Sequence, residues 1–179
     1  MRCKWGDKED MRDYHDKEWG KPVHDDRKLF EALTLDGAQA GLSWSTILNK
    51  REGYRKAFHN FDIKKVAKMN KKHVEKLMKN PDIVRNRLKI ESTITNARAF
   101  IKVQEEFGSF DKYFWQFVGK TRDNRPKTMK QIPTSTKESD AMSKDMKARG
   151  FRFVGSTICY AIMQGVGMVN DHVVDCDYR

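Results

Sequence analysis

The strongest constraint on the fold of this chain is a set of four residues with metal-binding side chains, placed at its two ends. Cys3 and His15 lie near the start of the sequence, and His172 and Cys176 lie near its end. Zinc binds two thiolates and two imidazoles in a closed tetrahedral site, which leaves no position open for a substrate. One structural zinc per chain would therefore bring segments 1–20 and 168–179 together. The alternative is that Cys3 is a disordered terminal residue and both histidines are ordinary polar residues.

The length and the cysteine content limit the classes of protein to which the chain could belong. The 179 residues suit one folded domain, which we expect to cover residues 1–179. Three cysteines are an odd number and do not make the disulfide framework of a secreted protein; Cys159, in an apolar segment, is expected to be a buried core thiol. No apolar run approaches the roughly 20 residues of a membrane span, and no signal-peptide pattern opens the sequence. We therefore expect a cytoplasmic monomer that acts without a membrane.

The charge of the chain points to a polyanionic partner. Lys and Arg outnumber Asp and Glu by 36 to 25, which gives a formal net charge of +11. This excess is larger than solubility requires. Nucleic acid is the first candidate partner, and an anionic membrane surface is the second.

The apolar residues recur mostly at helical spacing, which predicts an all-α fold. Helical segments are expected after Asp26, Ser43 and Asn70, each of which could cap a helix N-terminus. A longer helix is expected from Val84 to Glu106, ended by Gly108.

The second half of the chain combines one long polar loop with two further helices. Residues 119–133 are basic and unpatterned, so we expect a loop there. Ser135 and Glu138 match a capping box that starts a helix, and Gly150 is expected to end it. The apolar segment STICYAIMQGVG that follows reads as a buried helix.

The first third of the chain combines aromatic residues with one acidic residue in an apolar setting. Trp5, Tyr14 and Trp44 lie there, and Asp36 lies on a predicted helix within the run LDGAQAGLSW. Aromatic rings beside a carboxylate suit a flat heterocycle, because the rings stack on it and the carboxylate accepts its hydrogen bonds or faces its positive charge. The alternative is that the tryptophans are core residues and Asp36 is a solvated helix residue.

The end of the same run offers a residue for entering a DNA duplex. Gly41 is expected to end the helix and to place Leu42 on a tight turn. An enzyme that extrudes a base from DNA must fill the space left behind, and an apolar side chain on a tight turn is suited to this.

The segment KARGFRFVGST, residues 147–157, joins two predicted helices through a short turn. The backbone amides of Val154, Gly155 and Ser156 would point outward at the start of the second helix and form an anion site. Arg152 adds positive charge, which would make phosphate binding salt-dependent. An equally open alternative is a plain connection between two helices.

Several ordered motifs together resemble the DNA-3-methyladenine glycosylase I family over nearly the whole chain. They are CKW at 3–5, YHDKEWG at 14–20, LDGAQAGLSW at 35–44, IPTST at 132–136 and RGFRFVGSTICYAIMQGVGMVNDHVVDC at 149–176. The resemblance implies an all-α fold of the helix-hairpin-helix DNA glycosylase superfamily and a structural zinc. It also implies hydrolysis of the N-glycosidic bond of 3-methyladenine in alkylated double-stranded DNA, without strand cleavage.

The resemblance implies a role for each candidate residue. The zinc ligands would be Cys3, His15, His172 and Cys176. The extruded base would be bound by Tyr14, Asp36 and Trp44 with Trp5 nearby, and Asp36 is the one catalytic candidate. The DNA contacts would come from Gly41, Leu42, Arg152, Val154, Gly155 and Ser156, with Leu42 invading the duplex.

Two positions depart from the family pattern. Asp36 stands where the family has glutamate, and Met11 stands where the family tends to carry a tyrosine four residues before the zinc histidine. Both departures bear on how the base fits. The alternatives are thus a glycosylase with altered lesion specificity, a noncatalytic zinc-stapled DNA-binding protein, or an RNA-binding module. Related glycosylases stabilise the sugar cation with an aspartate shortly after the hairpin; Asp171 lies near that point, and we do not assign it that role.

Overall fold

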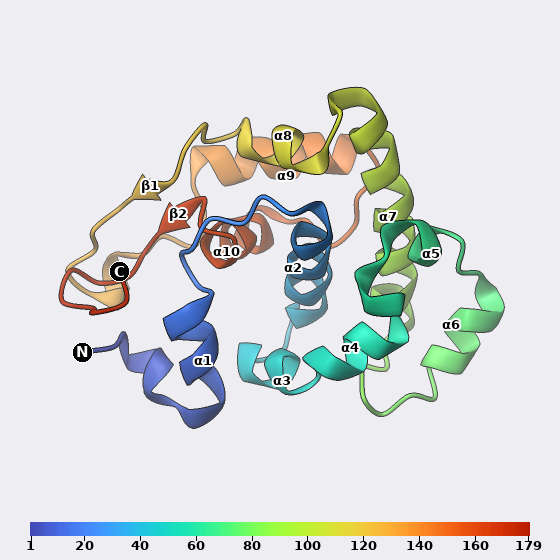
Figure 1. Cartoon of the computed structure of the whole chain (residues 1–179), viewed down its shortest axis with the longest axis horizontal. Coiled ribbons are helices and arrows are strands. Elements are labelled where there is room, and N and C mark those ends of the chain that lie inside the picture. Colours follow the sequence, from blue (N-terminus) through green and yellow to red (C-terminus); the bar gives the residue numbers. More distant parts are fainter.

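The computed structural model describes all 179 residues and is built almost entirely from helices (Figure 1). The α-helices are α1 (Glu9–Lys17), α2 (Asp26–Gln39), α3 (Trp44–Asn49), α4 (Arg51–Ala57), α5 (Ile63–Ala67), α6 (Lys71–Leu77), α7 (Arg87–Phe107), α8 (Phe110–Trp115), α9 (Lys137–Ala148) and α10 (Ser156–Gly165). Three short 3-10 helices cover Lys4–Asp7, His59–Phe61 and Met129–Gln131, and the only strands are β1 (Arg122–Asp123) and β2 (Val169–Asn170). The predicted all-α class is confirmed.

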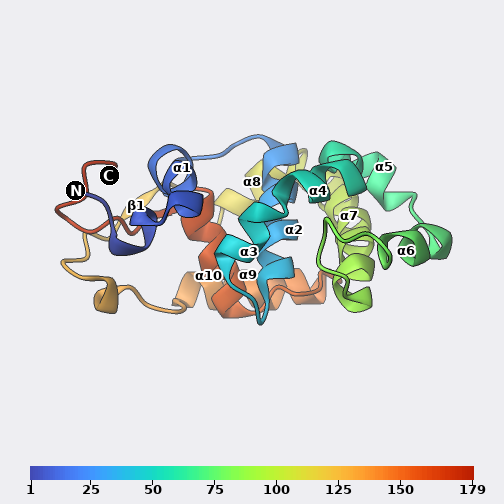
Figure 2. The same cartoon turned by 90° about the horizontal axis from the view of Figure 1, so that it is seen from below.

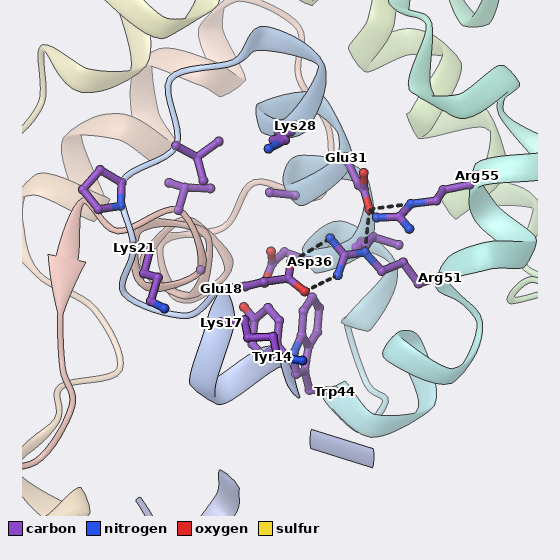
Figure 3. Close-up of a pocket in the computed structure, with 16 residues that line it drawn as sticks. Tyr14, Lys17, Glu18, Lys21, Lys28, Glu31, Asp36, Trp44, Arg51 and Arg55 are labelled. Carbon is purple, nitrogen blue, oxygen red and sulfur yellow. Dashed lines mark hydrogen bonds and ion pairs between the residues drawn. The ribbon is translucent and has the colours of Figure 1, made fainter. Parts of the chain in front are cut away.

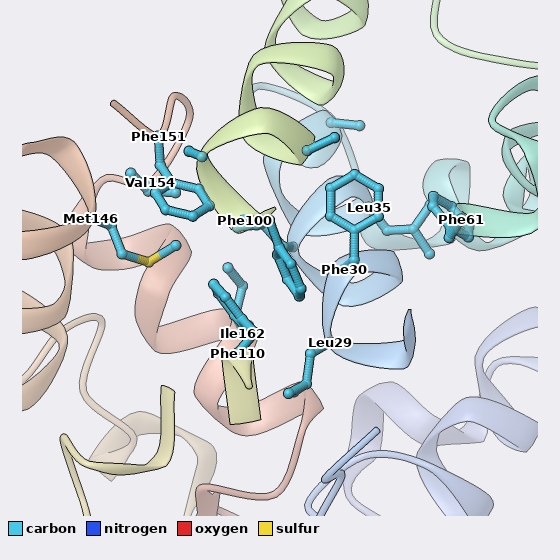
Figure 4. Close-up of a cluster of buried hydrophobic side chains, with 14 of the residues drawn as sticks. Leu29, Phe30, Leu35, Phe61, Phe100, Phe110, Met146, Phe151, Val154 and Ile162 are labelled. Atoms are coloured by element: carbon cyan, nitrogen blue, oxygen red, sulfur yellow. The ribbon is translucent and has the colours of Figure 1, made fainter. Parts of the chain in front are cut away.

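The main hydrophobic core lies where α2, α7, α8 and α10 meet (Figure 4). The rings of Phe100 on α7 and Phe110 on α8 are stacked with centroids 3.8 Å apart, and Ile162 on α10 is fully buried. Removing one such buried phenylalanine side chain costs about 3–5 kcal/mol. The core therefore holds α2 and α10 in fixed positions, and these two helices carry most of the residues discussed below.

Most helix boundaries follow the predicted signals. Ser43 and Asn70 each accept a hydrogen bond from a backbone N–H group in the first turn of the following helix. Gly108 ends α7 in the left-handed region, with φ of 85°. The start of α7 differs from the prediction, because the helix begins at Arg87 rather than at Val84 and is capped by Asn86.

The predicted cap of α2 was wrong by one residue. Asp25 caps α2, accepting from the backbone N–H of Lys28, whereas Asp26 is already inside the helix. Asp26 turns instead toward α8, where its carboxylate accepts from the backbone N–H groups of Phe110 and Asp111. A carboxylate at a helix N-terminus satisfies donors that have no partner within the helix, so Asp26 ties α8 to α2.

The predicted capping box of α9 was also displaced. The reciprocal pair is Thr136 with Ser139 rather than Ser135 with Glu138. Glu138 pairs instead with Arg122. The acidic side chain is therefore used to bind a distant segment, and a neighbouring hydroxyl takes over the local cap.

The two ends of the chain lie close together at one edge of the molecule (Figures 1 and 2). The expected loop over residues 119–133 includes β1, which pairs in parallel with β2 near the end of the chain. A small separate cluster of buried hydrophobic residues contains Cys3, Trp19, Val173 and Cys176. No helix is both long and apolar enough to cross a membrane.

Candidate functional site

The structure brings Cys3, His15, His172 and Cys176 together as one buried cluster. Their ligand atoms all lie within 4.8 Å of one another, and each of the four residues is at most 6% exposed. Nδ1 of His172 is 3.7 Å from Sγ of Cys3 and 3.2 Å from Sγ of Cys176, while Nε2 of His15 is 3.6 Å from Sγ of Cys176. Adjacent ligand atoms of a tetrahedral zinc with Zn–S near 2.3 Å and Zn–N near 2.0 Å lie roughly 3.3–3.8 Å apart. The cluster could hold a metal ion of this kind.

The second nitrogen of each histidine is held by a group outside the cluster. Nδ1 of His15 lies 2.8 Å from a carboxylate oxygen of Asp16, and Nε2 of His172 lies 3.1 Å from the backbone oxygen of Trp19. Arg2 donates hydrogen bonds to both carboxylate oxygens of Asp16 through Nε and Nη2, and these hold the pKa of Asp16 well below its usual range. Such outer partners fix the ring orientation, so that the other nitrogen of each histidine faces the cluster.

The protonation of the cluster also suits a cation. Burial raises the pKa of the Cys3 thiol to about 11 and lowers the pKa of His172. Without a metal, burial therefore keeps these two groups uncharged near neutral pH. A metal ion would have to displace the thiol protons, as metal binding to cysteine generally does.

An aromatic wall joins the metal cluster to a cavity. The ring centroid of Trp5 lies 4.9 Å from that of His15, 5.0 Å from that of Trp19 and 6.3 Å from that of Tyr14. The Tyr14 ring in turn lies 5.2 Å from Trp44. The orientation of these rings therefore depends on how the two chain ends are held.

All four predicted base-binding residues, Trp5, Tyr14, Asp36 and Trp44, line one cavity of about 390 Å³, which we call the aromatic cavity. A cavity of this size suits a small heterocycle rather than a large cofactor. Nε1 of Trp44 is buried without a hydrogen-bond partner. The cavity thus combines aromatic faces with a few polar groups that the protein itself does not satisfy.

Asp36 is the one carboxylic acid that lines this cavity. It lies on α2, is 5% exposed, and has a pKa raised to about 8 by burial alone. The alternative of a solvated helix residue is therefore wrong for Asp36. Because burial penalises the charged form, the carboxyl is mostly protonated at neutral pH until a positive charge or a donor enters the cavity.

A second cavity of about 420 Å³ lies on the other side of Tyr14, Asp36 and Trp44 and is strongly charged (Figure 3). Within it, Arg51 donates to both oxygens of Glu18 at 2.8 Å. Glu31 accepts from Arg51 and from Arg55. Since these charges are paired with one another, none of them forms an ion pair with Asp36, which keeps its raised pKa.

The turn that carries Leu42 is shaped by Gly41 and Lys89. Gly41 has φ of 77°, a conformation that favours glycine, and Leu42 is 40% exposed. Nζ of Lys89 donates to the backbone oxygens of Ala38 at 2.7 Å and Ala40 at 2.6 Å. Lys89 therefore satisfies the open C-terminal end of α2 and holds the turn that presents Leu42.

The hairpin between α9 and α10 has the geometry expected of an anion site. Gly155 precedes the first turn of α10, and a Cβ atom added there would meet nothing within 4 Å. The first backbone amides of α10 thus open to the surface. Arg152 is exposed and forms no ion pair, whereas Val154 is buried and contributes only its backbone. The Ser156 hydroxyl bonds to Ser139 and Asp140, so only its amide is free.

Two contacts fix the hairpin against the rest of the site. The buried side chain of Asn96 on α7 accepts from the backbone N–H of Arg152 and donates to its backbone oxygen. Phe153 packs against Gly37 on α2, where an added Cβ would lie 3.4 Å from that of Phe153. Since Gly37 follows Asp36 directly, the hairpin and the acid share one support.

Four polar residues of the site were missed by sequence analysis: Lys89, Asn96, Tyr160 and Gln164. Tyr160 and Gln164 line the aromatic cavity, four residues apart on α10. The sequence could have indicated these two, because polar residues four apart on an apolar helix share one face. Lys89 and Asn96 left no comparable signal, since their partners lie 49 to 56 residues away in the sequence.

Comparison with known proteins identifies the family. Residues 4–179 match the methyladenine glycosylase family model. The chain is 49% identical over 177 residues to the DNA-3-methyladenine glycosylase 1 of Escherichia coli (strain K12), covering 98% of this chain and 95% of that protein. A crystal structure of 3-methyladenine DNA glycosylase I superposes with a TM-score of 0.96 at 47% identity, covering 99% of this chain and 98% of that one.

A further solved structure contains a bound base. It is a tyrosine-to-phenylalanine variant of 3-methyladenine DNA glycosylase I in complex with 3-methyladenine, with a TM-score of 0.96 at 35% identity, covering 99% of this chain and 96% of that one. Sequence match and fold agree, and the chain belongs to the methyladenine glycosylase family.

Proposed function

We propose that this protein is a monofunctional DNA glycosylase that hydrolyses the N-glycosidic bond of 3-methyladenine in alkylated double-stranded DNA. The observation that carries the proposal is the aromatic cavity, where Trp5, Tyr14 and Trp44 surround the buried Asp36. The names of the relatives and the neighbour with bound 3-methyladenine support the same substrate.

The chemistry of the lesion explains why so small a site suffices. Methylation at N3 leaves adenine with a positive charge, so the base departs as a neutral purine and needs no strong general acid. The enzyme must extrude the nucleotide, hold the base and let water reach C1′. Methylated bases stack and pair less well, so extruding them costs less than extruding normal bases.

Asp36 is the catalytic residue in this proposal because it contacts the base itself. A cationic base in the cavity favours the ionised carboxyl and so lowers the pKa of Asp36 from about 8. The attraction between the two charges is strong because both are removed from water. A neutral normal adenine lacks that charge and leaves Asp36 protonated, which provides discrimination.

The tyrosine of the cavity acts as a neutral group. Burial raises the pKa of Tyr14 well above its ordinary value, so its hydroxyl remains protonated. Tyr14 can therefore donate a hydrogen bond to a ring nitrogen of the base while its ring packs beside Trp44.

The DNA is held by two elements with different roles. The amides of Val154, Gly155 and Ser156, with Arg152, bind a backbone phosphate and position the duplex. Leu42, on the turn made by Gly41, enters the space left by the extruded nucleotide.

The absence of a lysine from the aromatic cavity supports simple hydrolysis. None of the 15 residues that line the cavity is a lysine. A lysine amine is the usual nucleophile when a covalent intermediate with the sugar leads to strand cleavage. Water is then the nucleophile, and the strand stays intact.

The metal cluster would hold one zinc through Cys3, His15, His172 and Cys176. A zinc with four protein ligands has no open coordination position and supplies stability rather than chemistry. We infer that residues 1–179 act as one domain and as a monomer, because the wall of the base site is built from both ends of the chain.

Incubation with alkylated double-stranded DNA, followed by chromatography of the released bases, tests the proposal. We expect free 3-methyladenine to accumulate and the strand to remain uncut. A protein that binds the duplex and releases no base would instead be the noncatalytic DNA-binding protein.

One observation favours altered lesion specificity within the same activity. Asp36 is one methylene shorter than the glutamate of the family pattern, and Met11, which lines the cavity, replaces a tyrosine. Both changes enlarge or loosen the cavity around the base. A competition assay with several methylated purines measures this effect directly.

A further inference from the structure

A buried aspartate next to the metal cluster has no role in the mechanism described so far. Asp171 is 1% exposed and accepts three hydrogen bonds from side chains. Nδ2 of Asn124 donates to Oδ1 at 2.7 Å, while the Tyr160 hydroxyl and Nε2 of Gln164 donate to Oδ2 at 2.7 and 2.8 Å. All three partners are donors, and protein groups engage both carboxylate oxygens of Asp171.

The Asp171 carboxylate determines the orientation of the side-chain amide of Gln164. Placing the amide oxygen against Oδ2 of Asp171 would bring two acceptors within 2.8 Å of one another. Nε2 must therefore face Asp171, and Oε1 must face away from it. The backbone oxygen of Gln164 is fixed as well, since it accepts from the backbone N–H of Gly20 at 2.9 Å.

The amide oxygen of Gln164 has no protein partner and belongs to a residue that lines the aromatic cavity. Gln164 lines that cavity together with Tyr14, Asp36 and Trp44. Oε1 has no protein partner, yet it is not among the buried unpartnered atoms, which are Nε1 of Trp44 and NH1 of Arg179. An accessible acceptor with a fixed direction is thus presented to whatever occupies the cavity.

We propose that Gln164 is a specificity-determining residue that accepts a hydrogen bond from the amino group at the 6-position of the extruded purine, and that Asp171 is its positioning residue. The inference rests on the proposed function and deepens it. Adenine-type bases carry an amino donor at this position, whereas guanine-type bases carry a carbonyl acceptor. With Oε1 of Gln164 held in this orientation, it accepts a hydrogen bond from the amino group of an adenine-type base. It repels the carbonyl oxygen of a guanine-type base.

The arrangement adds a neutral acceptor of fixed orientation to the recognition of charge by Asp36. Asp36 responds to the positive charge of the base, and 3-methylguanine in DNA carries the same charge as 3-methyladenine. Only a group that distinguishes an amino donor from a carbonyl acceptor separates the two lesions. A site with a fixed hydrogen-bonding group discriminates strongly against a base that cannot satisfy it.

The test compares the release of 3-methyladenine and 3-methylguanine from one methylated duplex DNA that contains both. Gln164→Met keeps a side chain of similar length without the amide. We expect it to lower the ratio of 3-methyladenine to 3-methylguanine release about tenfold or more, the size of a lost hydrogen bond at a buried site. Asn124→Ser, which removes a donor to the opposite oxygen of Asp171, is the matched control and should keep the parental ratio within about twofold.

Asp171→Asn checks the positioning role. Asparagine can still offer one oxygen to Gln164, so this variant should retain most of the parental ratio, whereas Asp171→Ala should lose it. A parental ratio in Gln164→Met would overturn the proposal, even where Asp171→Ala fails to fold. Failure of the proposed function would look different, because the parent protein would release neither base.

Discussion

The metal cluster and the aromatic cavity share a wall but satisfy their polar groups in opposite ways. Around the cluster, both histidines have a second partner, Asp16 or the Trp19 backbone, and the thiols face the rings. In the cavity, Asp36 is buried with its pKa raised to about 8, and Nε1 of Trp44 has no partner. Polar groups that are buried without partners cost stability unless a ligand completes them. The cluster is therefore suited to stabilising the fold, and the cavity leaves polar groups that a ligand could satisfy.

The largest effect is expected from breaking the cluster. His172→Ala removes one of the four ligands and should lower the free energy of unfolding by on the order of 3–5 kcal/mol or more, because metal binding and folding are coupled. Thermal unfolding and native mass spectrometry measure stability and zinc content. Excision per folded molecule should fall much less. If activity were lost while stability and zinc content remained, the metal would be catalytic, and the contrast between the two regions would fail.

The second effect concerns the cavity, where two substitutions of Asp36 should change excision in opposite directions. Asp36→Asn should lower 3-methyladenine excision about ten- to a hundredfold, the cost of a lost charged hydrogen bond. Single-turnover assays on methylated DNA measure this loss. Asp36→Glu, which restores the side chain of the family pattern, should match or exceed the parent. Undiminished excision by Asp36→Asn would remove Asp36 from base recognition.

Asp36→Asn should also stabilise the folded protein. Since burial raises the pKa of Asp36 to about 8 from an unfolded value near 3.9, the folded state holds an extra proton between those values. The free energy of unfolding of the parent therefore falls as pH rises from about 4 to about 8. Asp36→Asn does not titrate, so its melting temperature should exceed that of the parent at pH 8. A lower melting temperature would show that the carboxylate is stabilising in the empty cavity.

The third prediction separates the two DNA contacts. Gly155→Glu places a bulky negative side chain where a phosphate would bind, and should weaken affinity for any duplex about tenfold. Leu42→Ala should instead reduce excision and leave affinity for undamaged DNA within about twofold, since the wedge acts only after the base has left the stack. Binding and excision assays on matched duplexes distinguish the two. Equal losses of affinity on undamaged DNA would contradict the division of roles.

The smallest effect is a dependence on pH. If the ionised form of Asp36 binds the cationic base, excision at low substrate concentration should fall about fivefold from pH 8 to pH 7, as expected for one group with a pKa near 8. Asp36→Asn provides the control, because it lacks the titrating group. A flat profile in the parent would mean that the cation enters without ionising Asp36.

Local sequence patterns predicted much of the fold and the candidate site residues. Caps such as Ser43 and Asn70, and the stop at Gly108, are signals that short segments carry by themselves. The cluster of two cysteines and two histidines could be predicted from the sequence, because few residue types can bind zinc.

The remaining features depend on contacts that short segments do not encode. Asp26 was predicted as a cap for its own helix, but packing directs its carboxylate to α8. The raised pKa of Asp36 requires knowing that nothing charged pairs with it. The link from Asp171 to Gln164 arises because the turn after β2 folds back on α10.

The position of the metal ligands also governs when the site can form during synthesis. Cys3 and His172 are 169 residues apart in the sequence, and ribosomes add roughly 5–20 residues per second. The first two ligands thus wait on the order of ten seconds or more before the others emerge. Until then the ring of Trp5 lacks the cluster that anchors it, so a nascent chain with α2 already folded has no finished base site. We therefore expect excision only from the completed chain, because Trp5 and residues of α10 line the same cavity.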